Sequence, residues 1–265
     1  MPRKDKPNYT ELTHQVVRES PEPLSFNEIL RRVHAITPIR TKNPKNTIRG
    51  AISQSRLIVA TGDGRYGWML RILNGVAIRL TLSDSDVAGQ AVEFGEELRE
   101  ALWPTFFEIQ KREDRNPVRV LLPDKTETRL PLDFLGQARW GTSGSPEFWK
   151  WFKTLKARRG DHLIFHVADG EARLYRVEFQ ARAARDEKAI AERNQSVVQA
   201  ALEYVRKSPW GAPIWDITAR LLATGQYHHP VPPDPLSEIW TQDVWEPVLR
   251  AKGYAGGWAP VGVDS

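Results

Sequence analysis

The stretch Asn43–Trp68, "NPKNTIRGAISQSRLIVATGDGRYGW", decides the fold of the first part of the chain. Asn43 is a typical helix-capping residue and Pro44 suits the first helical position, so a short helix is predicted over residues 44–54. Two β-like runs follow, joined by Gly62-Asp63-Gly64, whose residues tolerate the positive φ angles of a tight hairpin turn. The stretch therefore predicts a helix followed by a β-hairpin.

Two further helices are predicted upstream, in "NYTELTHQVVRESPEPLSFNEILRRVHAI" (residues 8–36). The pattern "SPEP" interrupts the helical spacing of the apolar residues. Ser25 and Glu28 then form the capping-box pattern of a second helix. Three helices and a β-hairpin in this order predict a winged helix, which we place over residues 8–82.

The third predicted helix has two unlike sides. Ile48, Ala51 and Ile52 are expected to face the core. The opposite side carries Lys45, Asn46, Arg49 and Ser53. Their amide, hydroxyl and cationic groups suit a DNA major groove, and Arg65 in the hairpin can reach phosphate or a minor groove. Arg40 and Lys42, in the basic linker before the helix, are further candidate DNA contacts.

Positive charge is concentrated in this first part of the chain. Residues 1–80 contain 14 lysine and arginine residues against 6 acidic ones, whereas residues 81–189 contain 18 against 19 and residues 190–265 contain 6 against 8. Clustered cations gain free energy by displacing the counterions of a polyanion. The distribution favours a nucleic-acid partner for the first third, with a solubilising charged face as the alternative.

Three segments of this region, "PLSFNEILRRV", "NPKNTIRGAISQ" and "GDGRYGW", resemble in this order the HARE-HTH family of winged helices. The resemblance spans residues 8–70. The family recurs in chromatin factors, in a bacterial RNA polymerase subunit and beside restriction-type nucleases. It implies association with double-stranded DNA. Some members act through protein contacts, so a winged helix that docks on a protein is the alternative.

The middle segment, residues 95–182, is predicted to be rich in short strands. β-like runs flank the turns "PDKTE" and "ADGEA", and a short amphipathic helix with Phe148, Trp149, Phe152 and Leu155 on its apolar side lies between them. Several short strands and one helix predict a small β-barrel rather than a sheet with long βαβ crossovers. The run "WKWFKTLKARRGDHLIFHV" resembles the B3-like pseudobarrel of plant transcription factors and of some restriction enzymes.

The B3-like resemblance implies a second DNA contact from exposed strands and loops of this barrel. Its candidate residues are Arg119, Arg129 and Arg139. The near-zero net charge of the segment weakens this interpretation, and solvated surface cations are the alternative. Gly160 and Asp161 are interpreted as turn formers.

The remaining chain is predicted to form a helical connector at 183–194 and a mostly helical domain at 195–263. "VVRESPEPLSFNEILRRV" matches "YVRKSPWGAPIWDITARLL" faintly, and a glycine-bearing hairpin follows each, "TGDGRYGWML" in the first case and "KGYAGGWAPVG" in the second. This internal repeat predicts a second, degenerate winged helix.

The second copy differs from the first where function would show. Its third helix would carry Glu238, Asp243 and Glu246, and acidic side chains beside phosphate are unfavourable. The copy is therefore not expected to grip DNA by the same face. Its tryptophans suit a core or a protein-partner surface; they are Trp210, Trp215, Trp240 and Trp245.

No catalytic residue, cofactor or metal site is predicted. Asp124, Glu127 and Arg129 match a metal-dependent nuclease pattern only superficially, because the two carboxylates share one turn and arginine replaces the lysine. His228, His229 and Asp234 lie in a proline-rich loop, where adjacent histidines do not readily face one ion. The chain has no cysteine, which excludes disulfides, cysteine-ligated zinc and thiol nucleophiles.

The sequence as a whole predicts an α+β, multi-domain, non-enzymatic protein that binds double-stranded DNA. It lacks an apolar run of about 18 residues and the apolar core of a signal peptide, so we expect no membrane partner and a cytoplasmic, nucleoid-associated location. A transcriptional regulator, or a sensor of modified or foreign DNA beside restriction machinery, fits these features. The alternatives are an adaptor docking on polymerase or nuclease subunits and, more remotely, a divergent nuclease.

Overall fold

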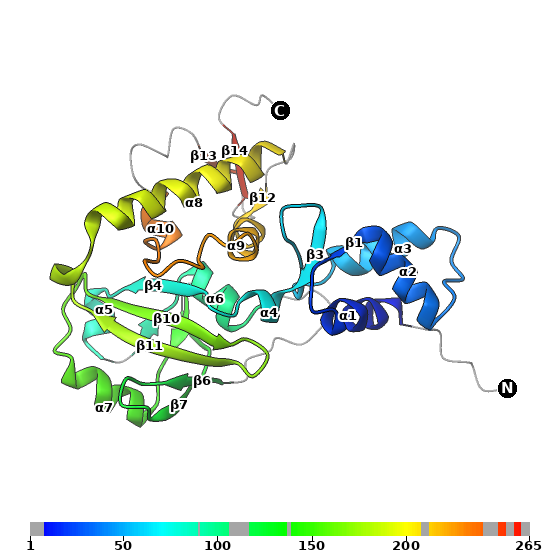
Figure 1. The fold of residues 1–265 in the computed structure, drawn as a ribbon. Coiled ribbons are helices and arrows are strands. Elements are labelled where there is room, and N and C mark those ends of the chain that lie inside the picture. Colours follow the sequence, from blue (N-terminus) through cyan, green and yellow to red (C-terminus); the bar gives the residue numbers. More distant parts are fainter. Residues whose placement is uncertain are drawn as a thin grey trace.

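The computed structural model describes residues 8–89, 91–105, 117–136, 139–207, 212–240, 249–252 and 257–260. The protein is a mixed α+β structure, as expected (Figure 1). Its N-terminal helices lie at one end, and a central sheet with helices above and below it forms the rest. None of the helices within the described ranges combines the length and hydrophobicity that a membrane-spanning segment requires.

The first unit contains three helices and a three-stranded sheet. In chain order its elements are α1 (Tyr9–Glu19), β1 (Leu24–Ser25), α2 (Phe26–Ile36), α3 (Pro44–Ser53), β2 (Ile58–Ala60) and β3 (Arg65–Trp68). The sheet order is β1-β3-β2, and both pairings are antiparallel. The three predicted helices and the hairpin are confirmed.

Short-range signals set where these helices begin. The Glu28 carboxylate accepts the backbone N–H of Ser25 at 2.8 Å, and the Ser25 hydroxyl accepts that of Glu28 at 3.3 Å. Asn43 Oδ1 accepts the backbone N–H of Asn46 at 3.1 Å, and Pro44 is the first residue of α3. Each such cap contributes about 1 kcal/mol to stability. The unit has a core of its own, made of Val16, Val17, Leu24, Ile29, Val33, Ile39, Ile48, Ile52, Ile58 and Trp68.

The central part contains two sheets. The larger has the order β4-β10-β11-β6-β7, with β4 (Ala77–Thr81), β6 (Val118–Leu121), β7 (Glu127–Leu130), β10 (His162–Asp169) and β11 (Leu174–Gln180). The smaller has the order β5-β9-β8, with β5 (Val92–Glu93), β8 (Asp133–Gly136) and β9 (Arg139–Thr142). The helices of this part are α4 (Met69–Ile72), α5 (Asp84–Val87), α6 (Glu96–Leu102) and α7 (Pro146–Thr154).

The predicted β-barrel is not closed. Over the described residues the edge strands β4 and β7 do not pair with each other, and β5, β8 and β9 form a separate sheet. Strand β4 pairs with β10, so residues 77–81, which were expected within the segment 8–82, belong to the central sheet. The reason is that the alternation within one strand indicates its buried face but not its distant partner.

The C-terminal part repeats the element order of the first unit. After the short 3₁₀ helix η1 (Arg182–Ala184) come α8 (Glu187–Lys207), β12 (Ala212–Pro213), α9 (Ile214–Ala223), α10 (Leu236–Ile239), β13 (Leu249–Lys252) and β14 (Gly257–Pro260). The sheet order β12-β14-β13 corresponds to β1-β3-β2. The predicted internal repeat is thus present as a repeated topology.

The C-terminal helices share one core with the central sheet. Helix α8 runs unbroken from Glu187 to Lys207, so the predicted connector at 183–194 is not a separate element. The residues that α8 buries, from Ile190 to Val205, face the interior, and most of them join a cluster that also contains strand residues of the central sheet. Figure 1 shows α8, α9 and α10 above the sheet and α7 below it.

A buried carboxylate ties this C-terminal part to the sheet. Asp234 lies 3.7 Å from Nε of Arg79 in β4 and 3.0 Å from Nη2 of Arg185. The amide of Asn194 in α8 donates to the same carboxylate at 3.0 Å. Buried charges persist only when they are paired, and removing one partner of such a pair costs about 3–5 kcal/mol. Asp234 is therefore a structural residue.

His162 completes this cluster as a neutral imidazole. Nη1 of Arg185 donates to Nε2 of His162 at 2.9 Å. Because a guanidinium only donates, Nε2 must carry a free lone pair. Burial, followed by the positive charges of Arg79 and Arg185, lowers the pKa of His162 from 6.5 to about 4.

We expect His162→Gln to remove a pH-dependent part of the stability. The unfolded chain binds a proton at His162 more readily than the folded chain, so stability present above pH 6.5 is lost as the pH falls toward 4. The free energy of unfolding of the wild type should fall, relative to that of the variant, by about 3 kcal/mol across this window. Urea denaturation of both proteins at pH 6.5 and pH 4 measures their free energies of unfolding. If the free energy of wild type minus that of the variant is the same at both pH values, the neutral state assigned to His162 is wrong.

Candidate nucleic-acid interface

The polar side of α3 faces solvent. Ile48, Ala51 and Ile52 are buried. The four residues of the opposite side are exposed: Lys45, Asn46, Arg49 and Ser53. Helical geometry places these residues on one face over about two turns. The predicted orientation of α3 is confirmed.

The cations of α3 and of the linker before it are not paired with any carboxylate that the structure describes. Among the described residues no carboxylate forms an ion pair with Arg40, Lys42, Lys45 or Arg49. The guanidinium carbon of Arg49 lies 5.1 Å from the ring centroid of Phe26, and this cation–π contact positions the side chain without neutralising it. The backbone N–H of Arg40 donates to the Tyr9 hydroxyl at 3.1 Å, which holds the linker against α1.

Arg65 is less free than expected. It is the first residue of β3, and the tip of the hairpin is Gly62-Asp63-Gly64 with both glycines at positive φ. Nε of Arg65 lies 3.5 Å from the Asp63 carboxylate, and the Arg65 side chain is 53% exposed. A neighbouring acid therefore partly neutralises the one cation that the hairpin offers.

The candidate arginines of the central part do not form one cationic surface. Arg119 donates two hydrogen bonds to Glu127, at 2.8 and 2.9 Å. Nη1 of Arg139 lies 3.4 Å from the Glu93 carboxylate, in the smaller sheet. Arg129 is exposed and lies opposite Arg119 in the β6–β7 pair. Carboxylates next to Arg119 and Arg139 offset part of their charge, whereas no carboxylate among the described residues pairs with Arg129.

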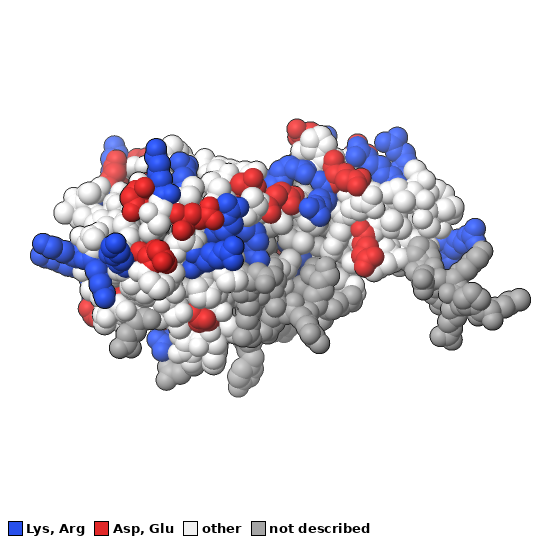
Figure 2. Space-filling view, turned by 90° about the horizontal axis from the view of Figure 1, so that it is seen from below, with Lys and Arg blue, Asp and Glu red and all other residues white. Residues whose placement is uncertain are grey.

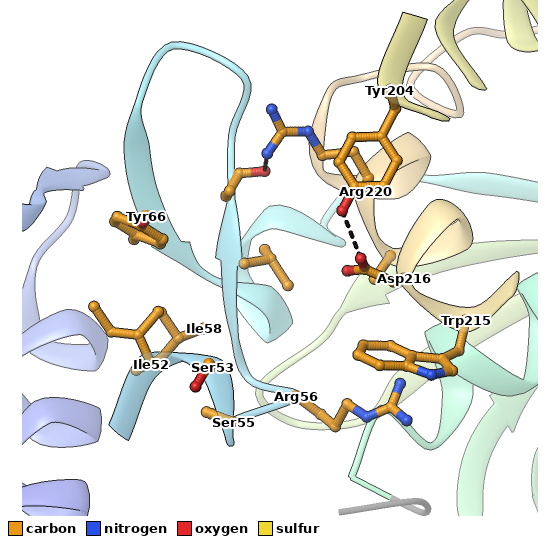
Figure 3. A pocket seen from close by; sticks show the side chains of 13 residues that line it. Ile52, Ser53, Ser55, Arg56, Ile58, Tyr66, Tyr204, Trp215, Asp216 and Arg220 are labelled. Atoms are coloured by element: carbon orange, nitrogen blue, oxygen red, sulfur yellow. Dashed lines mark hydrogen bonds between the residues drawn. The ribbon is translucent and has the colours of Figure 1, made fainter. Parts of the chain in front are cut away.

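A junction fixes the first unit on the C-terminal helices. Just after α3, Arg56 stacks on Trp215 of α9, with its guanidinium carbon 3.2 Å from the ring centroid. Arg56 also lies 4.0 Å from the buried Glu100 of α6. From α9, Arg220 donates to the carbonyl of Ala60 in β2 at 3.0 Å (Figure 3). Contacts from α6 and α9 therefore set the position of α3 and the hairpin relative to the body.

A cavity of about 170 Å³ remains inside this junction, between the end of α3, the hairpin and α9 (Figure 3). Two of its polar side chains, Tyr204 and Asp216, pair with each other. The Tyr204 hydroxyl donates to Asp216 at 2.5 Å, and the guanidinium of Arg220 lies 5.4 Å from the centroid of the Tyr204 ring. The groups around the cavity belong to this junction, which we call the joint between the first unit and helix α9.

Of the two positions that the sequence left open for the C-terminal tryptophans, core or partner surface, the described ones take the first. Trp240 is buried, and Trp215 is half-buried beneath Arg56. Trp210 and Trp245 lie outside the described residues, as do Asp243 and Glu246. The described tryptophans therefore serve intramolecular packing because the C-terminal part shares its core with the sheet and its α9 with the first unit. Glu238 of α10 is exposed, as its predicted outward position requires.

The remaining polar candidates make separate local contacts. Asp124 accepts the backbone N–H of Thr126 at 2.9 Å and closes the β6–β7 turn. His228 Nε2 lies 2.8 Å from the carbonyl of Ile72, whereas His229 contacts the backbone of Val231. Within the described ranges no three metal-ligating side chains come together.

Comparison of the chain with protein-family models, with curated proteins and with solved structures gives no significant match. The exposed face of α3 and the joint beside it are therefore the features that bear on function.

Glu100 gives the joint an unusual titration. Burial raises the pKa of Glu100 from 4.5 to about 7, against the opposing effect of Arg56 and Arg99. The Asp216 carboxylate raises it further. A carboxyl that titrates near neutrality thus lies beside the arginine that docks the first unit.

We expect Glu100→Gln to change the pH dependence of stability in the sense opposite to His162→Gln. The folded chain keeps the Glu100 proton between pH 4.5 and 7 while the unfolded chain releases it, so stability falls as the pH rises through this window. Glutamine cannot ionise, so the variant should gain about 3 kcal/mol relative to wild type between these limits. Denaturation at both pH values measures this gain. The exposed Glu147→Gln serves as control, and an equal response of both variants would contradict the assignment.

Proposed function

We propose that this chain is a non-enzymatic protein that binds double-stranded DNA through the outward face of α3. The observation that carries this proposal is that Lys45 and Arg49 are exposed and free of described ion pairs, with Asn46 beside them. Cations bind phosphates, and an amide both donates to and accepts from base edges. One helix face thus presents both cations for phosphate contacts and an amide for base contacts.

We infer that the first unit is a winged helix of the HARE-HTH type. The order α1-β1-α2-α3-β2-β3 with the sheet β1-β3-β2 supports this. Helix α3 has 10 residues and is therefore about 15 Å long, and an α-helix with a diameter of about 10–12 Å fits a major groove about 12 Å wide. In this arrangement α3 enters the groove and the hairpin lies alongside it.

We infer further that the C-terminal repeat is a degenerate winged helix with a packing role. Its first helix, α8, buries its apolar side in the core that it shares with the central sheet, and its second, α9, contacts the first unit through Trp215 and Arg220. Neither helix is free to dock on DNA. The central part contributes at most Arg129 to the proposed interface, because Arg119 and Arg139 are paired.

The resemblance to families found beside chromatin and restriction machinery supports two biological roles. One is transcriptional control, and the other is the sensing of modified or foreign DNA for a separate nuclease. Docking on a polymerase or nuclease subunit is the competing function. Salt dependence distinguishes them, because phosphate contacts release counterions whereas a mixed protein interface does so much less.

Replacing Lys45 and Arg49 by alanine should weaken duplex binding and flatten its salt dependence. Each lost phosphate contact lowers the slope of log K against log salt by about 0.9, so the double variant should lose about 2. Fluorescence anisotropy with a labelled duplex over a salt series measures both quantities. Arg18→Ala is the matched control, because Arg18 is 63% exposed on α1 of the same unit. Equal slopes for wild type and the double variant would favour the adaptor function.

Asn46→Ala should reduce base discrimination and leave the salt slope unchanged. A paired amide contact to adenine accounts for about 1–3 kcal/mol of discrimination, whereas Asn46 carries no charge. Enrichment of random duplexes, methylated and unmethylated, by wild type and variant measures the loss of preference. Gln15→Ala on the exposed side of α1 is the amide control. An unchanged enrichment profile would show that Asn46 does not contribute to base discrimination.

A further inference from the structure

A second cationic surface lies at the end of the molecule opposite to α3. It is a groove between the end of α7, the turn before β10 and the segment around η1, and its cations include Lys156, Arg158, Arg159 and Arg182. Figure 1 shows α7 at one end and the N-terminal helices at the other. Figure 2 shows Lys and Arg side chains gathered at this end of the molecule. We call this feature the α7 groove.

Most of these cations are not neutralised. Among the described residues no carboxylate forms an ion pair with Lys156, Arg158 or Arg182. Arg159 pairs with Asp84 at 3.2 Å, but both side chains are at least 75% exposed, and exposed pairs of this kind are weak. Arg185 also lines the groove, and it is committed to Asp234 and Glu187.

Asp161 builds the groove without cancelling its charge. Its Oδ2 accepts the backbone N–H of Arg158 at 2.7 Å, and its Oδ1 accepts that of Arg182 at 2.8 Å. Asp161 is only 9% exposed. One buried carboxylate therefore holds two chain segments side by side through their backbones. Both guanidinium groups remain available to a ligand.

The other acids near the groove are also engaged. Asp186 accepts the backbone N–H of Ala189 at 3.0 Å at the start of α8. Glu187 lies 3.0 Å from Nε of Arg185. The lining thus contains five cations, Lys156, Arg158, Arg159, Arg182 and Arg185, against two acids, Asp161 and Glu187, so its positive charge is in excess.

The chemistry of the groove differs from that of α3. Its lining contains no amide or hydroxyl side chain, whereas α3 presents Asn46 and Ser53. Lysine and arginine side chains bind phosphate oxygens. The α7 groove therefore has the side chains that binding to a phosphate backbone requires, and it lacks the amide that pairs with adenine.

We propose that the α7 groove is a second DNA-binding site, which holds the phosphate backbone of a duplex. The inference rests on the proposed function only for the identity of the polyanion. Lys156, Arg158 and Arg182 supply the contacts, and Asp161 positions the last two.

The backbone at Lys156 allows a variant that removes charge without a folding penalty. Lys156 follows the end of α7 with φ of +50°, a left-handed conformation that glycine adopts most easily. Lys156→Gly therefore removes a cation and relieves backbone strain. Alanine at positions 158 and 182 keeps both N–H groups that donate to Asp161.

The test is the salt dependence of duplex binding by the full chain carrying Lys156→Gly, Arg158→Ala and Arg182→Ala. Loss of three phosphate contacts should lower the slope of log K against log salt by about 2–3, with base preference and thermal midpoint maintained. Lys125→Gly is the matched control, because Lys125 is exposed, has a left-handed φ of 67° and does not line the groove. It should leave the slope unchanged.

The proposals for α3 and for the α7 groove can be refuted independently of each other. An unchanged slope in the triple variant, with a reduced slope in the Lys45/Arg49 variant, overturns the α7 groove and keeps the function proposed for α3. The reverse pattern overturns the α3 function and keeps the groove. If the triple variant unfolds, Arg158→Glu alone decides, since it keeps the backbone donor to Asp161. A strong loss of affinity then supports the groove, and wild-type affinity overturns it.

Discussion

The burial of one apolar stripe, Ile48, Ala51 and Ile52, fixes the rotation of α3 about its axis, and the proposed reading face depends on this rotation. Successive helical residues are separated by about 100°, so a helix that buries these positions presents Asn46, Arg49 and Ser53 outward, with Lys45 at the edge of the buried stripe. Burial of each isoleucine contributes about 1.5–3 kcal/mol. A rotation that hid the cations would lose this free energy and would also bury unpaired charge. The core therefore determines the chemistry of the surface.

The joint extends the same constraint from one helix to the whole molecule. Arg56 follows α3 closely and is held between Trp215 and Glu100, while Arg220 holds the backbone of the adjoining hairpin. The two copies of the repeat have thus diverged in use. The first leaves the polar side of its third helix in solvent. The second contributes its helices to the core that it shares with the central sheet, and its helix α9 contacts the first unit.

Features encoded within a few residues were predictable, and features built from distant segments were not. Asn43 and the Ser25–Glu28 pair define helix starts locally, so the caps and the hairpin were correctly predicted. Asp234 shows the opposite case, because its partners in β4 and α8 meet it only after the sheet has assembled. The open sheet was missed for the same reason: no local pattern indicates that β4 pairs with β10.

Two signals were nevertheless present in the sequence. The register of the β6–β7 hairpin places Arg119 diagonal to Glu127, which would have identified this arginine as paired. The runs "KARRGD" and "ARAARDEK" are both basic at their centres. Averaging charge over the segment concealed them, because acids elsewhere in the segment balance the sum. The turn pattern at Asp161 predicts its local role, whereas its carboxylate also joins the two runs into one groove.

If both cationic surfaces bind phosphate, their placement determines what the whole chain does with DNA. A duplex is stiff over about 150 base pairs, so one duplex reaches both surfaces only by lying along the body of the protein. Figure 2 shows cations and acids interspersed over the face between the two ends, so a duplex laid along the body meets both signs of charge. Because the junction around Arg56 holds α3 in place relative to the body, the distance between the two surfaces is fixed. Two separate duplexes, one at each end, meet the two surfaces without this alignment.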